Sequence, residues 1–222
     1  SETLGEPVVL ETAKSFDEFA DRTLDGRYTL VYTAPHFVPP AMDSGRYEVI
    51  AAPSVPVGGH IMVPTGSSYA SLTQLAGKRF AHPPISAFVT LIGRSFLKTN
   101  GLIGDKQPIY VTQQSHNAAY LASLAGDADA AIIGTFTVEK AKQDGMREIA
   151  KTATYPATAI LANTTRLVAQ QRQQIQQAIV NLSESEKGRK ILQAIEFPGF
   201  RPASPADYEV LRPLWDEIKQ PK

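Results

Sequence analysis

The sequence predicts an α/β protein in which parallel strands form sheets covered by helices on both faces. Three observations lead to this fold class. Short apolar runs of strand length alternate with longer segments whose apolar residues recur at helical spacing. Glycine follows several of the helical segments, where it ends a helix at little steric cost. The 222 residues are enough for one large domain or for two lobes of about 100 residues each.

The first part of the chain shows one well-marked helix between strands. Ser15 can cap it, Glu18 stands three residues later and Gly26 ends it, so a helix is predicted over residues 15–26. The segment PHFVPPAM is predicted to be a stiff, proline-rich loop. The strands and extended segments expected here are residues 7–12 (a buried strand), 28–32, 47–53 and 58–66.

Residues 78–135 are predicted to form a compact βαβαβ unit, preceded by a short helix at residues 71–78. In an open sheet of this type, ligands bind beyond the carboxyl ends of the strands, at the starts of the following helices. The strands are predicted at residues 78–84, 107–114 and 128–135, and the helices at 87–100 and 115–126.

The rest of the chain is predicted to be mainly helical, and no internal repeat is recognised. A long amphipathic helix is expected over residues 166–182, because its glutamines form one face and its aliphatic residues another. The other elements predicted are helices at 137–145 and 185–195, a strand at 157–164, and a last helix within 200–218, capped near Ser204 or Asp207.

The charge balance argues against a polyanionic partner. Lys and Arg together number 22, and so do Asp and Glu, so the chain has no global basic field. We therefore expect no nucleic-acid partner, and we expect any anion to be held by local geometry. No apolar run reaches the roughly 18 residues of a membrane helix. No signal peptide opens the sequence, so we expect either a cytosolic protein or one whose targeting segment has been removed.

The composition also limits metal and thiol chemistry. Cysteine is absent, which excludes disulfides, thiolate metal sites and cysteine nucleophiles. The histidines lack the HExxH spacing of a zinc site, so neither a metal nor a cofactor is predicted. The four histidines are His36, His60, His82 and His116.

The loop after the strand at residues 78–84 is the first candidate ligand site. Ser86 is a plausible N-cap of the next helix. The free N–H groups of Ala87, Phe88 and Val89 would then form a small anion cradle with the Ser86 hydroxyl. The alternative is that Ser86 does no more than cap the helix.

Two further polar clusters also follow strands. His116 and Asn117 open the helix at 115–126, and Thr33, His36 and Phe37 follow an earlier strand. Taken singly, the histidine would be structural or merely exposed, and the second cluster a packed surface loop. Taken together, the clusters favour a shared site for a small oxyanion or polar ligand. Binding would depend on pH if His116 or His36 has to be protonated to pair with an anion.

Three segments resemble a known family when they are read in order. They are SLTQLAGKRFAHPPISAFVTLIGRSFLKTNGL, QQSHNAAYLASLAGDADAAIIGTF and FRPASPADYEVLRPLWDEI. This series is similar to the PhnD-like phosphate, phosphite and phosphonate substrate-binding proteins of ABC transporters. The resemblance runs over nearly the whole chain.

The resemblance implies a type II periplasmic-binding-protein fold, with two α/β lobes and a ligand clamped in the cleft between them. Lobe I would comprise residues 1–63 and 156–222, and lobe II residues 64–155. The chain would cross between the lobes near Val63–Pro64 and near Tyr155–Pro156. The first strand and helix that lobe I has in the family should precede residue 7, and this sequence starts too late for them.

The resemblance also implies the ligand-binding residues. Ser86 with the N–H groups of Ala87 and Phe88 would form the oxyanion cradle, and His116 would add a donor. The complete set expected at the site is Thr33, His36, Phe37, Ser86, Ala87, Phe88, His116, Asn117 and Thr135. Two departures weaken the case for phosphonate itself: the cradle has fewer hydroxyls than usual, and Gly134–Thr135 stands where an aspartate is frequent.

The function expected is therefore capture of a small oxyanion or phosphonate-like ligand and its delivery to an ABC permease, by a periplasmic or extracytoplasmic monomer. The alternative is an extracytoplasmic ligand-sensing domain of a signalling protein. An enzyme is not expected, and no catalytic residue is assigned. Ser86 and His116 lack a GxSxG elbow, and no acid stands where it could orient the histidine.

Overall fold

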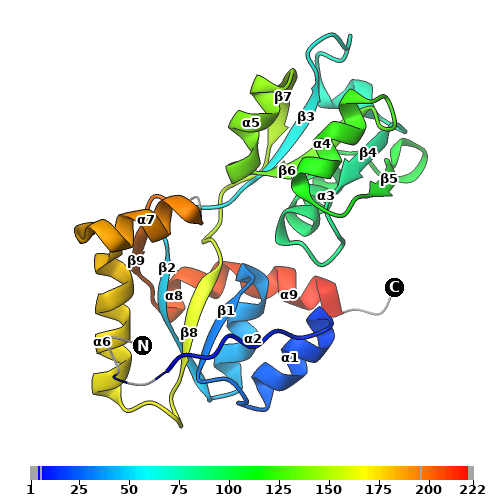
Figure 1. The fold of residues 1–222 in the computed structure, drawn as a ribbon. Coiled ribbons are helices and arrows are strands. Elements are labelled where there is room, and N and C mark those ends of the chain that lie inside the picture. The colour runs from blue at the N-terminus through cyan, green and yellow to red at the C-terminus, as the bar shows by residue number, and fades with distance from the viewer. Residues whose placement is uncertain (1–4, 6, 196, 220–222) are drawn as a thin grey trace. The chain divides into compact units, whose positions relative to one another are not determined.

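The computed structural model describes residues 5, 7–195 and 197–219 (Figure 1). The chain divides into two compact units: unit 1 comprises Ser1–Pro56 and Pro156–Lys222, and unit 2 comprises Val57–Tyr155. The crossing expected at Val63–Pro64 needs correction, because it falls inside strand β3 (Gly59–Pro64) of unit 2. β3 belongs there because it pairs with two other strands of that unit.

The two connecting segments start side by side in unit 2. The Val57 N–H donates to the Tyr155 carbonyl (2.9 Å), and the Tyr155 N–H donates to the Val57 carbonyl (2.8 Å). The chain passes from unit 2 to unit 1 between Tyr155 and Pro156, where the second crossing was expected. A pair of backbone hydrogen bonds therefore marks the edge of unit 2.

Unit 1 contains a four-stranded sheet in which every pair of neighbours is antiparallel. The expectation of a parallel sheet is wrong for this unit. The strand that the chain forms on its return from unit 2 inserts between β1 and β2, so these two strands do not pair with each other. In sheet order the strands are β1 (Leu30–Thr33), β8 (Ala159–Asn163), β2 (Tyr47–Pro53) and β9 (Phe200–Pro202).

Local sequence signals determine the first helix of unit 1 but mislead in the segment after β1. Helix α1 (Phe16–Leu24) starts as predicted, since the Ser15 side chain accepts a hydrogen bond from the Glu18 N–H. The segment PHFVPPAM is helical instead of a loop: it forms the 3-10 turn η1 (Pro35–Phe37) and the helix α2 (Val38–Asp43). Its prolines are tolerated because they occupy first-turn positions, whose N–H groups have no partner within the helix.

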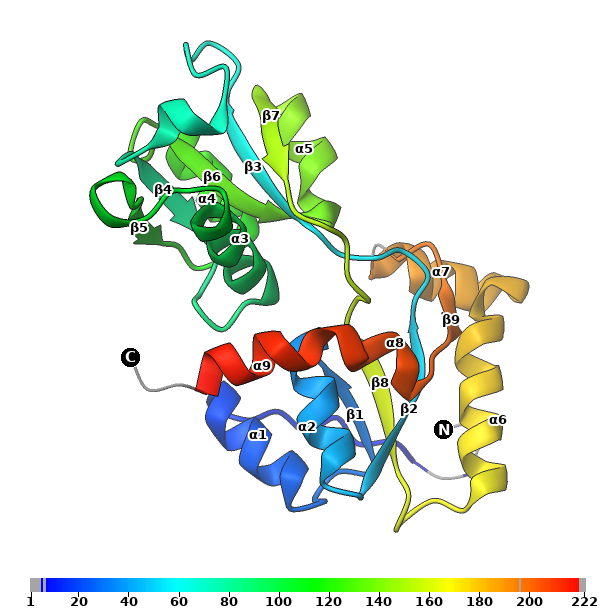
Figure 2. The ribbon, with the colours of Figure 1, turned by 180° about the vertical axis from the view of Figure 1, so that it is seen from behind.

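Helices pack on both faces of the unit 1 sheet. Figures 1 and 2 show α2 and α6 on opposite sides of β2, the strand that both contact. The α6 side has an apolar core that includes Ile50, Ala162 and Ile175. The helices in the C-terminal part are α6 (Ala169–Val180), α7 (Glu186–Ala194), α8 (Pro205–Tyr208) and α9 (Arg212–Lys219), with the 3-10 turns η5 (Asn181–Glu184) and η6 (Glu209–Leu211).

Residues 7–12 do not form the buried strand that was predicted. This segment has no regular secondary structure and is exposed, with Val8 at 64%, Val9 at 84% and Leu10 at 90% exposure. It pairs with no strand among the residues that the structure describes, so its apolar side chains have no sheet to cover them.

Unit 2 contains a five-stranded mixed sheet that includes the predicted βαβαβ unit. β4 lies between β5 and β6 and is parallel to both, as expected. The other two strands are β3, which pairs antiparallel with β6, and β7, which pairs antiparallel with β3. β7 was not predicted. In sheet order the strands are β5 (Ile109–Thr112), β4 (Arg79–His82), β6 (Ala130–Gly134), β3 (Gly59–Pro64) and β7 (Met146–Lys151). The helices are α3 (Phe88–Thr99), α4 (His116–Leu124) and α5 (Val138–Gln143), with the 3-10 turns η2 (Leu72–Leu75), η3 (Gly104–Lys106) and η4 (Thr135–Thr137).

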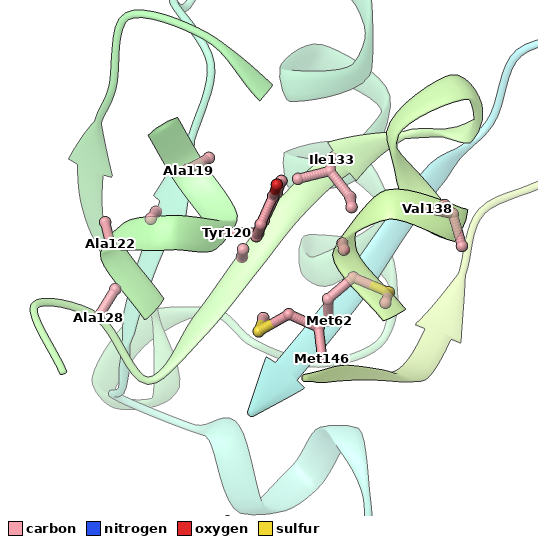
Figure 3. Packing of buried hydrophobic residues seen from close by; sticks show 11 residues of the cluster. Met62, Ala119, Tyr120, Ala122, Ala128, Ile133, Val138 and Met146 are labelled. Carbon is pink, nitrogen blue, oxygen red and sulfur yellow. The ribbon is translucent and has the colours of Figure 1, made fainter. Parts of the chain in front are cut away.

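Both faces of the unit 2 sheet are buried, and successive side chains alternate between two apolar cores. Ile132 packs on one side, with Leu97 of α3, whereas its neighbour Ile133 packs on the other, with Tyr120 of α4. Figure 3 shows the second core, where Met62 and Met146 lie with Tyr120. Burial on both faces explains why these strands are continuous apolar runs in the sequence.

The structure reveals an internal repeat that the sequence analysis did not recognise. The series α1–β1–η1–α2–β2 in unit 1 recurs in unit 2 as α4–β6–η4–α5–β7, displaced by about 100 residues along the chain. Few residues are shared, which hides the repeat in the sequence. The identical pairs are Ser15/Ser115, Leu24/Leu124, Gly26/Gly126, Val38/Val138, Ala41/Ala141, Gly45/Gly145 and Glu48/Glu148. Most of them are caps, left-handed glycines or buried positions, which are the residues that this local structure requires.

Candidate ligand-binding site

The carboxyl ends of three parallel strands meet at one edge of the unit 2 sheet. β4, β5 and β6 run in the same direction, so the segments that follow them lie at the same edge. These segments are the starts of α3, α4 and η4. The first residues of β3 join them, because β3 runs antiparallel to β6 and Gly59 pairs with Gly134. This edge brings together most of the polar residues that the sequence analysis selected.

The start of α3 offers backbone donors, although not the ones that were predicted. The N-cap is Ala87, and Ser86 lies exposed in the preceding turn, so the assignment of Ser86 as the cap is wrong. The Ala87 N–H is also used, because it donates to the Pro84 carbonyl over 2.8 Å. The first two helical N–H groups belong to Phe88 and Val89, and a helix provides no backbone acceptor for them. These two donors lie at the positive end of a 12-residue helix.

The start of α4 is capped as its sequence predicts. The Ser115 side chain accepts a hydrogen bond from the Ala118 N–H over 3.1 Å. The N–H groups of His116 and Asn117 precede that bond and have no partner within the helix. The Asn117 side chain is exposed, so it is free to reach a solute at this edge.

His116 has a defined role at this edge. Its Nδ1 accepts a hydrogen bond from the Gly134 N–H over 3.0 Å, so Nδ1 carries no proton. Burial lowers the pKa of His116 below its usual value, which keeps the ring neutral. A neutral ring that accepts at Nδ1 donates through Nε2–H. The expectation of a cationic histidine is therefore corrected to a neutral hydrogen-bond donor.

Gly134 lets the two helix starts approach the end of β6. A methyl group at this position would lie 3.1 Å from Cε1 of His116 and 3.2 Å from Cγ1 of Val89, closer than side chains normally pack. The first turns of α3 and α4 thus both contact the backbone at Gly134. An alanine there would force the His116 ring or the Val89 side chain to give way by a few tenths of an ångström.

Thr135 is engaged within the protein. Its hydroxyl lies 2.9 Å from the Gly58 nitrogen, whose N–H donates to it, and 3.3 Å from Nε2 of His60. His60 in turn pairs through Nδ1 with the Glu148 carboxylate. Thr135 therefore ties the end of β6 to the segment before β3. Its place among the ligand-binding residues stays a prediction, and its hydroxyl already has partners within unit 2.

Thr33 belongs to the predicted unit 1 cluster and is buried, as are His36 and Phe37. Its side chain is 3% exposed, and its hydroxyl has no hydrogen-bond partner among the described residues. It ends β1 opposite Ala159, where the chain enters β8. Tyr32, which the sequence analysis missed, is half exposed beside it, and its hydroxyl lies 2.7 Å from the Thr158 hydroxyl. The alternation of apolar and exposed positions along β1 is the signal that points to Tyr32.

His36 and Phe37 lie in the core of unit 1. They are 1% and 0% exposed, and both rings pack against Trp215 of α9, with ring centroids 6.3 and 5.6 Å away. Burial lowers the pKa of His36 to about 4. Their predicted role at a ligand site is corrected accordingly, since side chains packed in this way have no surface left for a solute.

Two further observations concern metals and membranes. Within the described part of the chain, no three His, Asp or Glu side chains gather closely enough to hold a metal ion. Among the same residues, no helix combines the length and apolar character that crossing a membrane requires.

Solved structures with the same fold include binding proteins of ABC transporters. PhnD1 from Prochlorococcus marinus, in complex with methylphosphonate, aligns with a TM-score of 0.76 and 16% identity, over 90% of this chain and 82% of its own. A Xanthomonas citri protein bound to ATP aligns with a TM-score of 0.75 and 15% identity, over 93% and 84%. A binding-protein component of a Pseudomonas aeruginosa ABC phosphonate transporter gives 0.72 and 13%, over 91% and 72%. At these identities the likeness establishes the fold.

The sequence itself establishes the family. No curated protein matches the chain. Residues 1–208 do match the family described as the periplasmic substrate-binding protein of the phosphonate ABC transporter. The mixed α/β units agree with that assignment, as does a sheet edge lined with backbone donors. The chain therefore belongs to the family of periplasmic, phosphonate-type substrate-binding proteins of ABC transporters.

Proposed function

We propose that this protein captures a small oxyanion or phosphonate-like ligand and delivers it to an ABC permease. Family membership supports the transport role, and the convergence of two helix starts at Gly134 is the observation that carries the ligand class. The methylphosphonate in the P. marinus relative is a ligand of this class.

The proposed site uses neutral donors. In unit 2 these are the N–H groups of Phe88 and Val89, the Ser86 hydroxyl, Nε2–H of His116 and the exposed amide of Asn117. Hydrogen bonds to a charged group contribute roughly 1.5–3 kcal/mol each, so three or four of them support micromolar affinity after the costs of binding. Backbone amides and a neutral imidazole suit a small anion better than a long polyanion.

We further propose that Thr33 of unit 1 is a ligand-binding residue. The support is its buried hydroxyl, which lacks a hydrogen-bond partner among the described residues. The ligand would leave when the protein docks on its permease. We propose that the protein acts as an extracytoplasmic monomer and not as an enzyme.

A thermal-shift screen followed by calorimetry tests this function. Methylphosphonate, phosphite and inorganic phosphate are each added in millimolar excess to the whole chain. A ligand that binds the folded protein raises the melting temperature by mass action. At least one of these anions is expected to raise it and to bind with micromolar affinity. No shift and no heat with any of them would reject the proposed ligand class.

A further inference from the structure

Two buried side chains, Thr90 and His82, form hydrogen bonds to the loop that leads into α3. The Thr90 hydroxyl donates to the carbonyl of Pro83 over 3.0 Å. Nδ1 of His82 lies 2.5 Å from the same oxygen, and because a carbonyl only accepts, this nitrogen carries the proton. Thr90 is 0% exposed and His82 1% exposed, so both bonds are shielded from water.

These bonds are unusual for their positions. A threonine inside a helix normally bonds to the carbonyl one turn earlier, as Thr99 of the same helix does with Ser95 over 2.9 Å. Thr90 instead reaches seven residues back, out of the helix and into the preceding loop. The N-cap Ala87 has no side chain that could order the loop. The loop is therefore held by hydrogen bonds to the carbonyls of Pro83 and Pro84 and not by a capping side chain.

The orientation of the His82 ring also depends on its hydrogen bond to the Pro83 carbonyl. Its other ring nitrogen, Nε2, is buried and has no hydrogen-bond partner in the part of the chain that the structure describes. Burying that nitrogen without a partner is unfavourable. Burial lowers the pKa of His82, which keeps the ring neutral with its proton on Nδ1. The bond to Pro83 and the edge-on packing against Tyr110 are what hold this ring in place.

We infer that Thr90 and His82 are positioning residues for anion binding: by holding the Pro83 carbonyl they set the direction of the Phe88 and Val89 N–H groups. The chain of contacts is short. Pro83 is fixed by the two side chains, Ala87 is then fixed by its bond to the Pro84 carbonyl, and α3 starts at the next residue. This inference rests on the proposed function for its ligand, although the contacts themselves do not.

The test compares Thr90→Val, which keeps the shape of the side chain and removes its hydroxyl, with Thr90→Ser, which keeps the hydroxyl. Thr99→Val is the matched control, because it removes a threonine hydroxyl bond from α3 without touching the loop. Calorimetric titration with methylphosphonate, phosphite and phosphate is expected to show affinity about fivefold weaker for Thr90→Val. Thr90→Ser is expected to lie within about twofold of wild type, as is Thr99→Val.

A second readout does not need the ligand. Hydrogen–deuterium exchange of the amides of residues 85–89 is expected to be faster in Thr90→Val than in wild type, and normal in Thr90→Ser and Thr99→Val. Unchanged exchange in Thr90→Val would overturn the inference, and so would wild-type affinity in that variant. If wild type binds none of the three anions, the proposed ligand class fails by itself, and the exchange comparison still decides whether Thr90 positions the loop.

Discussion

The N–H of Gly134 donates to Nδ1 of His116, with 3.0 Å between the two nitrogens. This bond joins the end of β6 to the first turn of α4 and selects one tautomer of the ring. It also opposes protonation, because an imidazolium would turn a second N–H toward the N–H of Gly134. The histidine at this edge therefore acts through a fixed neutral donor.

The first prediction follows for the pH dependence of His116→Ala. The variant is expected to weaken methylphosphonate binding by about 1–2 kcal/mol at pH 8, since one hydrogen bond to a charged group is lost. The loss relative to wild type is expected to be no larger at pH 6, because burial lowers the pKa of His116 and the Gly134 N–H opposes a proton on Nδ1. Calorimetric titration of wild type and His116→Ala at both pH values measures this loss. At each pH the ratio of the wild-type affinity to the variant affinity is used, because the ionisation of the ligand affects both proteins equally.

A clearly larger loss at pH 6 than at pH 8 would mean that His116 acts as a cation, contrary to the geometry. His116→Gln is the companion variant. Its amide can place a donor near the position of Nε2, so it is expected to recover part of the affinity at both pH values.

Local signals made much of unit 2 and α1 predictable. Ser15 and Ser115 cap their helices, and Gly26 and Gly126 follow them with positive φ, so short-range rules suffice. The apolar strands of the βαβαβ unit were equally clear. The order of the unit 1 sheet was not, because β8 inserts between β1 and β2 through contacts that are distant in the chain.

The candidate site was predictable in place but not in atomic detail. The strand ends and helix starts follow from the α/β pattern, and His116 and Phe88 lie there. The N-cap of α3 moved from Ser86 to Ala87 because a turn closed by the Pro84 carbonyl precedes it. The tautomer of His116 depends on Gly134, and the burial of His36 depends on Trp215, both far away in the sequence. Such pairings require the tertiary structure.

The second prediction separates ligand binding from helix capping. Ser86→Ala is expected to weaken anion binding by about 1 kcal/mol and to leave the melting temperature unchanged, because Ser86 is exposed and caps nothing. Ser115→Ala is the matched control. Its hydroxyl caps α4, so its loss is expected to lower the free energy of unfolding by about 1 kcal/mol. Thermal melts and calorimetry on the two variants check both effects. Wild-type affinity in Ser86→Ala would remove this hydroxyl from the site.

The third prediction concerns acid stability and His36. Its pKa is about 4 in the folded protein and near 6.5 in the unfolded chain, so between these values the unfolded state binds more protons. The stability that the neutral ring contributes is therefore complete above pH 6.5 and is lost as the pH falls toward 4. At pH 5 the loss is about 2 kcal/mol.

Fluorescence of Trp215 measures this loss, because it is the single tryptophan of the chain and packs against His36. Urea unfolding at pH 7.5 and pH 5 is compared for wild type and His36→Phe, which keeps an aromatic ring and cannot titrate. The wild type is expected to lose about 2 kcal/mol more than the variant over this interval. An equal loss in both proteins would show that His36 does not titrate in this way.

The fourth prediction concerns the packing of α3 on the unit 2 sheet. Gly93 lies on the buried face of α3, and a methyl group there would lie 2.5 Å from Cγ2 of Ile132. Gly93→Ala is therefore expected to destabilise unit 2 by about 1–3 kcal/mol through overpacking, despite the better helix propensity of alanine.

The double variant Gly93→Ala/Ile132→Ala, compared with Ile132→Ala alone, isolates the clash. In the shortened background the added methyl group is expected to cost little or to stabilise, because it fills space left by the isoleucine. Urea unfolding of the four proteins measures the coupling. Strict additivity of the two changes in unfolding free energy would show that α3 and β6 adjust without strain. Glycine at position 93 would then not be required for the close approach of α3, the helix whose first turn carries the Phe88 and Val89 donors.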